Sequence, residues 1–209
     1  GFSGSTPMWM SNLDKYSGLF GNYGKFDIPA QLQAGFAYDL LPDLTLMADW
    51  RHIFYSAVPA IGNGGWTLQF RSLGAGAGLD YRDTDSASFG VEWRATPALA
   101  LRAGYHYATL ALRSRSLNFA ALATSVNNHH FGAGFNYAVT KNSSFDFAFL
   151  WAFKNSVSGF ESIPQSAGLP FGRINTGANI TVWAYGGAFT VGYNYKFDAD
   201  DESWLPTHF

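Results

Sequence analysis

The sequence contains no cysteine, so it can form neither a disulfide framework nor a thiolate metal site. Charged residues occupy only 13% of the 209 positions, roughly half of their usual share in soluble proteins. Lysine and arginine form no basic run, and a net charge of −2 offers no broad attraction to the phosphates of nucleic acid. Nucleic acid is therefore not an expected partner.

Long apolar runs are missing too. Purely apolar runs are short, such as AFLWAF at 148–153, whereas a membrane-spanning helix needs about 20 apolar residues. This excludes transmembrane helices. The chain begins at Gly1 without a charged and apolar leader, so we expect that a signal peptide was removed or that the chain is a piece of a longer protein.

Aromatic residues, by contrast, reach 18%, and 23 positions are glycine. Apolar and polar side chains alternate with a period of two in several stretches, which predicts β-strands because successive side chains in a strand point to opposite faces. The clearest is SFDFAFLWAF, in which every second residue from Phe145 to Phe153 is aromatic. The seven predicted strands are 28–39, 44–55, 86–94, 99–107, 129–137, 143–153 and 180–197.

The connections between these strands alternate in length. Those at 40–43, 95–98 and 138–142 are tight, and those at 56–85, 108–128 and 154–179 are long. If every connection is a hairpin, all tight turns lie at one end of the sheet and all long loops at the other, which is typical of outer-membrane barrels. The pattern predicts an all-β fold, a transmembrane antiparallel up-and-down β-barrel with seven or eight strands in residues 1–197. The acidic segment 198–209 is expected to be a solvated tail.

Aromatic placement supports a membrane barrel. Amphipathic rings at both borders of an apolar band bury their bodies in lipid and wet their polar tips. The group near the tight turns is Tyr38, Trp93, Tyr137 and Tyr195, and the group nearer the long loops is Trp50, Tyr107, Trp151 and Trp183. The alternative is a soluble sandwich or barrel, whose alternation would reflect a buried inner face.

The polar face of the strands would line the barrel interior. Side chains kept from bulk water need partners, so structural pairing is the expected role of most of them. The residues concerned are Gln31, Gln33, Asp49, Arg51, Glu92, Arg94, Arg102, His106, Asn136 and Asp146.

Enzymatic functions find little support. His129 and His130 are adjacent and would point to opposite faces of a strand, so they are expected to be surface or rim residues rather than ligands of one metal. No G-x-S-x-G motif occurs, although a hydrolase could assemble Ser, His and Asp from distant strands. We predict no catalytic residue, no metal and no cofactor.

Four blocks of sequence resemble the FadL/TodX family of outer-membrane transporters for long-chain fatty acids and other hydrophobic compounds. They are DKYSGLF, FDIPA, LLPDLTLMADW and ATPALALRAGY, in family order, and the resemblance runs from about residue 8 to residue 197. It implies a fourteen-stranded barrel closed by a small N-terminal hatch. This chain is similar to the C-terminal half alone, with seven strands and a partial strand at about residues 7–13.

The resemblance also implies an outer binding groove. In the family, the loop that matches residues 13–27 is partly helical, stands on the extracellular side and helps to form a groove for the hydrophobic tail. In this sequence four side chains at offsets of three and four would share one helical face: Leu13, Tyr16, Leu19 and Phe20. The alternative is that these four pack against a neighbouring loop.

Arg82 is a candidate for the head group of the ligand. Family members have a basic residue near this point that meets the fatty-acid carboxylate, and a guanidinium suits that contact through paired hydrogen bonds. Arg82 has the same parity as Ser86 and Ser88. It would face the lumen if the strand extends that far.

The sequence thus predicts a monomeric outer-membrane barrel that takes up a hydrophobic molecule by passive binding and diffusion. The expected partners are a fatty acid or another hydrophobic small molecule and the surrounding outer-membrane lipid, including lipopolysaccharide. A small closed barrel of about eight strands, acting as an anchor or adhesion surface, is a second possibility. Its interior would be filled by side chains, so it could not transport.

Overall fold

The computed structural model describes residues 1–16, 21–64, 78–117, 126–163 and 174–197, and they form an all-β structure. The strands are β1 (Phe2–Ser5), β2 (Gln31–Leu41), β3 (Leu44–Ile53), β4 (Thr84–Thr96), β5 (Leu99–Ala108), β6 (His129–Ala138), β7 (Ser143–Ile163) and β8 (Ile174–Tyr195). Short helical turns lie in the connections: η1 (Asp14–Tyr16), α1 (Gly21–Gly24), η2 (Tyr55–Ala57), α2 (Pro59–Gly62) and η4 (Ser114–Ser116). No helix in these ranges is long and apolar enough to cross a membrane.

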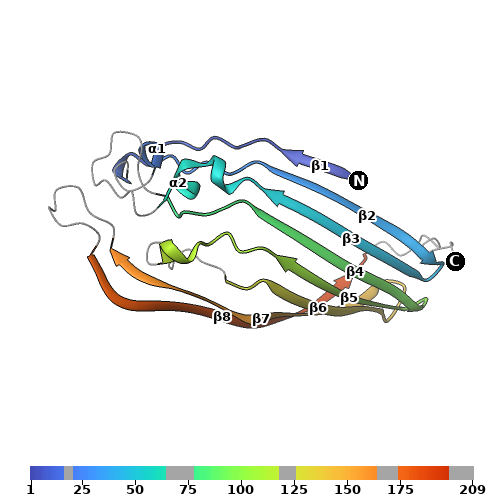
Figure 1. The fold of residues 1–209 in the computed structure, drawn as a ribbon. Coiled ribbons are helices and arrows are strands. Elements are labelled where there is room, and N and C mark those ends of the chain that lie inside the picture. The colour runs from blue at the N-terminus through green and yellow to red at the C-terminus, as the bar shows by residue number, and fades with distance from the viewer. Residues whose placement is uncertain (17–20, 65–77, 118–125, 164–173, 198–209) are drawn as a thin grey trace.

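All eight strands belong to one antiparallel sheet in the order β1-β2-β3-β4-β5-β6-β7-β8. Figure 1 shows a curved wall with the tight turns at one end and the helical turns at the other. We call these the short-turn end (connections 42–43, 97–98 and 139–142) and the long-loop end (connections 54–83 and 109–128). The predicted alternation of tight and long hairpins is confirmed. Among the described residues no ladder joins β8 to β1, so a small closed barrel does not form from these strands.

The first part of the sheet differs from the prediction. The strand expected at 28–39 begins at Gln31, because Pro29 has no N–H to donate to a ladder. The partial strand expected at 7–13 is wrong. The first strand is Phe2–Ser5, and residues 8 and 12 form only isolated bridges, Met8 with Ile28 and Asn12 with Lys25.

The hairpin of β7 and β8 is longer than predicted. Residues 154–163 and 174–179, expected to be loop, continue the two strands. A register shift between Ala152 and Asn155 interrupts the alternation, so the period of two is lost from the sequence although the pairing resumes. The extended hairpin reaches past the other strands at the long-loop end (Figure 1).

The register sorts the side chains into two faces as predicted. Phe89, Tyr105 and Phe131 lie side by side on neighbouring strands of one face, here called the outer face. The opposite face, which carries the polar set, is the inner face. Phe145 and Trp151 remain 45% and 37% exposed. This contradicts a soluble sandwich, which would bury the aromatic stripe.

The described hydrophobic core lies under the long loops instead of between sheets. Leu112, Leu117 and Val126 are buried together there, against Val157 and Val182 of the extended hairpin. The strands themselves bury little of their apolar surface in the chain's own core. The apolar outer face therefore needs an apolar environment other than the protein's own core, and a lipid bilayer provides one.

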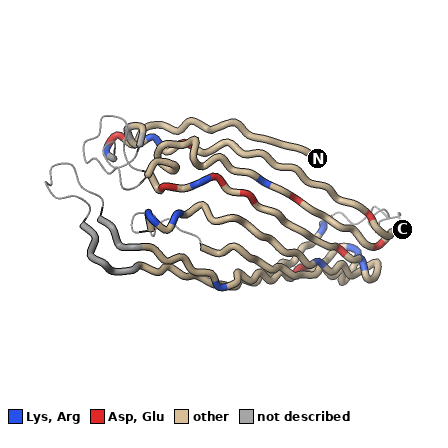
Figure 2. Tube along the Cα trace, viewed as in Figure 1, with Lys and Arg blue, Asp and Glu red and all other residues tan. Residues whose placement is uncertain are grey.

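Two girdle tryptophans satisfy their polar tips at opposite borders of the outer face. The indole Nε1 of Trp93 donates to Asp43 at the short-turn end, and that of Trp50 donates to Asp85 at the long-loop end, both at 3.1 Å. Trp93 pairs with Leu44, six residues before Trp50, which corresponds to roughly 20 Å along the strand. Figure 2 shows that most strand positions between the two ends carry no charge.

Candidate functional site: the inner face and the base of the long loops

Charged groups near the short-turn end of the inner face are paired. Glu92 lies 2.7 Å from Nε of Arg102 and 3.3 Å from Nε of Arg94. On the neighbouring strands, Asn136 donates to Asp146 at 2.7 Å. The expectation that inner-face polar residues mainly pair with one another holds for this layer, which joins β4 to β7.

Two hollows lie on the inner face, on the long-loop side of these paired residues. The larger, of about 610 Å³, is lined mainly by small or apolar residues of β5 to β8. The smaller, of about 220 Å³, is lined by Gln33, Asp49, Arg51, Ser86, Ser88 and His106. Ser88 and His106 line both hollows. An apolar hollow therefore adjoins a polar one on the inner face.

The larger hollow exists because glycines align across the sheet. Gly90, Gly104 and Gly132 are consecutive partners on β4, β5 and β6. With no side chains at these positions, the wall is indented by the depth of one layer of side chains. A Cβ on Gly132 would meet nothing closer than 3.7 Å, which is an ordinary van der Waals contact, whereas one on Gly134 would lie 2.5 Å from the carbonyl oxygen of Phe147.

Histidines border the larger hollow. Nδ1 of His106 lies 3.0 Å from Oγ of Ser88, and the rings of His106 and His130 are 5.5 Å apart. Nδ1 of His130 is buried without a hydrogen-bond partner among the described residues. His129 and His130 do face opposite ways, but the expectation of a surface or rim position is right only for His129, which contacts Tyr105 on the outer face. His130 lies on the inner face because it follows His129 within β6 and pairs with His106 of the neighbouring strand.

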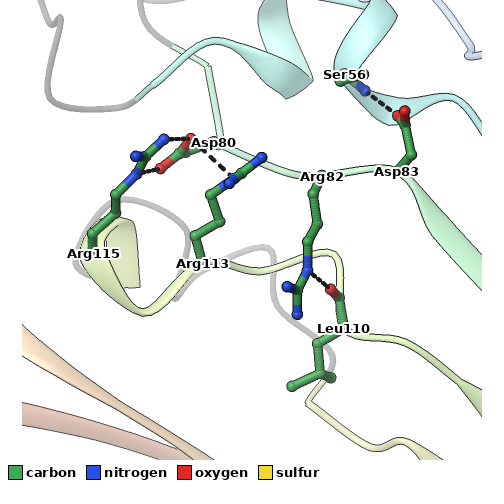
Figure 3. A network of polar contacts seen from close by, with 7 residues as sticks. All are labelled: Ser56, Asp80, Arg82, Asp83, Leu110, Arg113 and Arg115. Carbon is green, nitrogen blue, oxygen red and sulfur yellow. Dashed lines mark hydrogen bonds and ion pairs between the residues drawn. The ribbon is translucent and has the colours of Figure 1, made fainter.

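A second polar cluster ties the base of the long loops together (Figure 3). Asp80, whose side chain is only 3% exposed, accepts hydrogen bonds from Nε and Nη2 of Arg115. Nε of Arg113 lies 3.5 Å from the same carboxylate. Hydrogen bonding and the charge of Asp80 raise the pKa of Arg115 above its ordinary value, so this guanidinium stays charged at physiological pH.

Arg82 belongs to the same region but uses a different partner. Its Nε donates to the carbonyl oxygen of Leu110 at 2.7 Å, and its backbone N–H donates to Ala111. Parity would place Arg82 in the lumen only if the strand extended to residue 82. Strand β4 begins at Thr84, so this condition is not met. Figure 3 shows the Arg82 side chain directed towards the carbonyl oxygen of Leu110.

Two backbone features position this cluster. Asp80 has φ of 54°, a left-handed conformation that aspartate and asparagine tolerate better than most residues. Gly159 of β7 lies so close to η4 that a Cβ would come within 2.0 Å of the carbonyl oxygen of Ser114. The extended hairpin thus holds the segment that carries Arg113 and Arg115.

The residues predicted for the outer groove are described only in part. Leu13 is exposed, and its N–H donates to the carbonyl oxygen of Gly24 at 3.1 Å. Two helical turns, η1 and α1, follow it in the chain. Tyr16 ends η1, but its side chain is not described, and Leu19 and Phe20 lie outside the described residues, as does the tail at 198–209.

Sequence reasoning missed the loop cluster and the glycine floor. Asp80, Arg113 and Arg115 lie in connections without periodicity, and only the fold brings them together. The glycines did leave a signal, since Gly90, Gly104, Gly132 and Gly134 occupy inner-face positions of three predicted strands. Among the described residues no group of three or more histidine, aspartate or glutamate side chains could hold a metal ion.

Comparisons with known proteins agree with this architecture. Solved structures similar in fold include the toluene transporter TodX of P. putida (TM-score 0.52, 18% identity) and a Pseudomonas aeruginosa FadL homologue (TM-score 0.54, 18% identity). The matches cover 82% and 83% of this chain but only 35% and 37% of those proteins, so the chain spans about a third of their length. The comparison with curated proteins returned no match.

The family model described as outer membrane protein transport protein (OMPP1/FadL/TodX) matches residues 16–197. This range contains the strands from β2 to β8, both inner-face hollows and the loop cluster. The chain therefore belongs to the OMPP1/FadL/TodX family of outer-membrane transport proteins.

Proposed function

We propose that this protein takes up long-chain fatty acids or other hydrophobic compounds across the outer membrane by passive binding and diffusion. The observation that carries the proposal is the two-faced wall. Its outer face exposes an aromatic band that suits lipid, and its inner face carries an apolar hollow beside polar groups. No covalent chemistry is required, because burial of apolar surface at about 25 cal/mol per Å² draws the ligand from water.

The site at the long-loop end would receive the ligand first. Leu13, Tyr16, Leu19 and Phe20 form the outer groove in this proposal, and Arg82 meets the carboxylate of a fatty acid. Among the described residues Arg82 forms no ion pair, and its Nε bonds a neutral carbonyl. A charged donor of this kind binds a carboxylate more strongly than a neutral donor would.

Uptake of radiolabelled oleate by cells that lack their own fatty-acid transporter tests the proposal. Cells expressing the full-length protein are expected to take up oleate saturably, and the R82Q variant, with the charge removed, should raise the half-saturating concentration. Toluene uptake, measured in parallel, separates fatty acids from aromatic hydrocarbons as substrates. A barrel that is folded in the outer membrane but takes up neither compound faster than empty-vector cells would contradict the proposed transport.

A further inference from the structure

The smaller hollow on the inner face holds two opposite charges that are not paired with each other. Arg51 donates from Nη2 to Gln33 at 3.3 Å and forms no ion pair among the described residues. Asp49 lines the same hollow, and no described residue bonds its carboxylate. Other inner-face arginines differ, since Arg94 and Arg102 both contact Glu92.

An unpaired guanidinium and an unpaired carboxylate in one hollow offer a donor and an acceptor at once. A carboxylate ligand would be attracted by Arg51 but repelled by Asp49. A head group that both accepts and donates a hydrogen bond would satisfy the two side chains together. Hydroxyl groups and protonated carboxyl groups have this property.

The adjoining hollow suits the remainder of such a molecule. It shares Ser88 and His106 with the polar hollow and continues over Gly104, Gly132 and Leu150. A volume of about 610 Å³ lies within the usual range of small-molecule sites. Head and tail could thus be bound without any rearrangement of the sheet.

We propose that the inner face binds an amphiphile with a neutral head that both donates and accepts hydrogen bonds. The head lies between Asp49 and Arg51, and the apolar body lies in the glycine-floored hollow. This inference rests on the proposed transport function and adds a second station to it. Arg51 faces Ser86 across the sheet, four residues beyond Arg82, which puts the second station roughly 13 Å further along the wall.

The test uses the full-length protein in lipid nanodiscs and three radiolabelled probes: 1-dodecanol, dodecane, and laurate at pH 8. Binding is measured as the excess of probe over protein-free nanodiscs of equal lipid content. The wild type is expected to bind 1-dodecanol several-fold more tightly than dodecane, because one further pair of hydrogen bonds forms. It should also prefer 1-dodecanol to laurate.

Three variants locate the site. R51M should weaken binding of 1-dodecanol about fivefold and leave dodecane unchanged, since it removes only the charged donor. D49N should strengthen binding of laurate, since it removes the repelling charge. Gly132→Leu should weaken binding of both 1-dodecanol and dodecane, because Gly132 lines the larger hollow and a leucine side chain would occupy part of it. R94M is the matched control, since Arg94 lines neither hollow, and it should bind all probes as the wild type does.

Equal effects of R51M and R94M on 1-dodecanol would overturn the inference. It would also be overturned if laurate bound the wild type more tightly than 1-dodecanol and D49N changed nothing. In both cases oleate uptake by the wild type would leave the proposed transport intact. If the folded wild type bound none of the probes and took up no oleate, the transport proposal would fail together with this inference.

Discussion

Asp80 accepts two hydrogen bonds from Arg115, one from Nε at 2.7 Å and one from Nη2 at 2.9 Å. The pair joins the segment before β4 to the segment after β5, and next to it the Arg82 N–H donates to Ala111. The Asp80 carboxylate is buried, whereas the Arg115 guanidinium is more than half exposed. Solvent therefore screens the charge of Arg115 but not that of Asp80. The pair fixes the base of the loops more than it stabilises the sheet.

Asp80→Asn should loosen this base without straining the chain. Asparagine tolerates φ of 54°, but it removes the charge that strengthens both hydrogen bonds, a loss of about 1 kcal/mol for a partly exposed pair. The Arg82 amide should then exchange with deuterium roughly fivefold faster. Asp14→Asn, at an exposed position in η1, is the control, and equal exchange in both variants would contradict the assigned role.

Gly159→Ala should displace the segment that carries Arg113 and Arg115. The added Cβ would come within 2.0 Å of the Ser114 carbonyl oxygen, and such overpacking costs about 1–3 kcal/mol. Hydrogen exchange over 110–117 should accelerate by about tenfold or more. Gly186→Ala on the partner strand, where nothing lies within 4 Å, should leave this exchange as it is in the wild type.

Two inner-face glycines of one strand should respond differently to alanine. On Gly134 a Cβ would lie 2.5 Å from the Phe147 carbonyl oxygen, whereas on Gly132 the nearest atom is 3.7 Å away. Gly134→Ala should therefore lower the folded fraction, seen as the heat-modifiable band on electrophoresis. Gly132→Ala should fold as the wild type does, and identical behaviour of the two variants would refute the described register of β6 and β7.

Most of the sheet could be predicted from the sequence, because lipid on one side and polar groups on the other leave a period of two. The positions of the girdle residues Trp50 and Trp93 and the inner-face placement of Glu92 and Arg102 follow from that rule. Strand ends were less predictable. Pro29 shortened β2, and the bulge after Ala152 concealed the continuation of β7.

The candidate site was less accessible to sequence reasoning. Asp49, Arg51 and His106 were placed on the inner face by parity alone, but parity does not reveal which of them lack partners. The pairing of Asp80 with Arg115 spans 35 residues and joins two connections without a repeating pattern. Such contacts depend on the path of the backbone, which the composition of a loop does not encode.

Phe149→Arg should impair insertion far more than Ala148→Arg. Phe149 lies on the outer face in the row of Ala133 and Phe189, and an arginine near the middle of the lipid band costs about 2–4 kcal/mol. Ala148 faces the inner side, where water and Thr190 can solvate the new charge. The yield of heat-modifiable barrel in isolated outer membranes measures the difference. A higher yield for Phe149→Arg than for Ala148→Arg would mean that lipid contacts the face described here as inner.

The most direct test of the two-faced wall uses the absence of cysteine, which allows single cysteines to be introduced along β7 and spin-labelled in nanodiscs. At 145, 147, 149 and 151 the labels should be accessible to oxygen, which concentrates in lipid. At 144, 146, 148 and 150 they should be accessible to a water-soluble nickel complex. Labels at the odd positions that are shielded from both reagents, or that meet the nickel complex, would contradict the account.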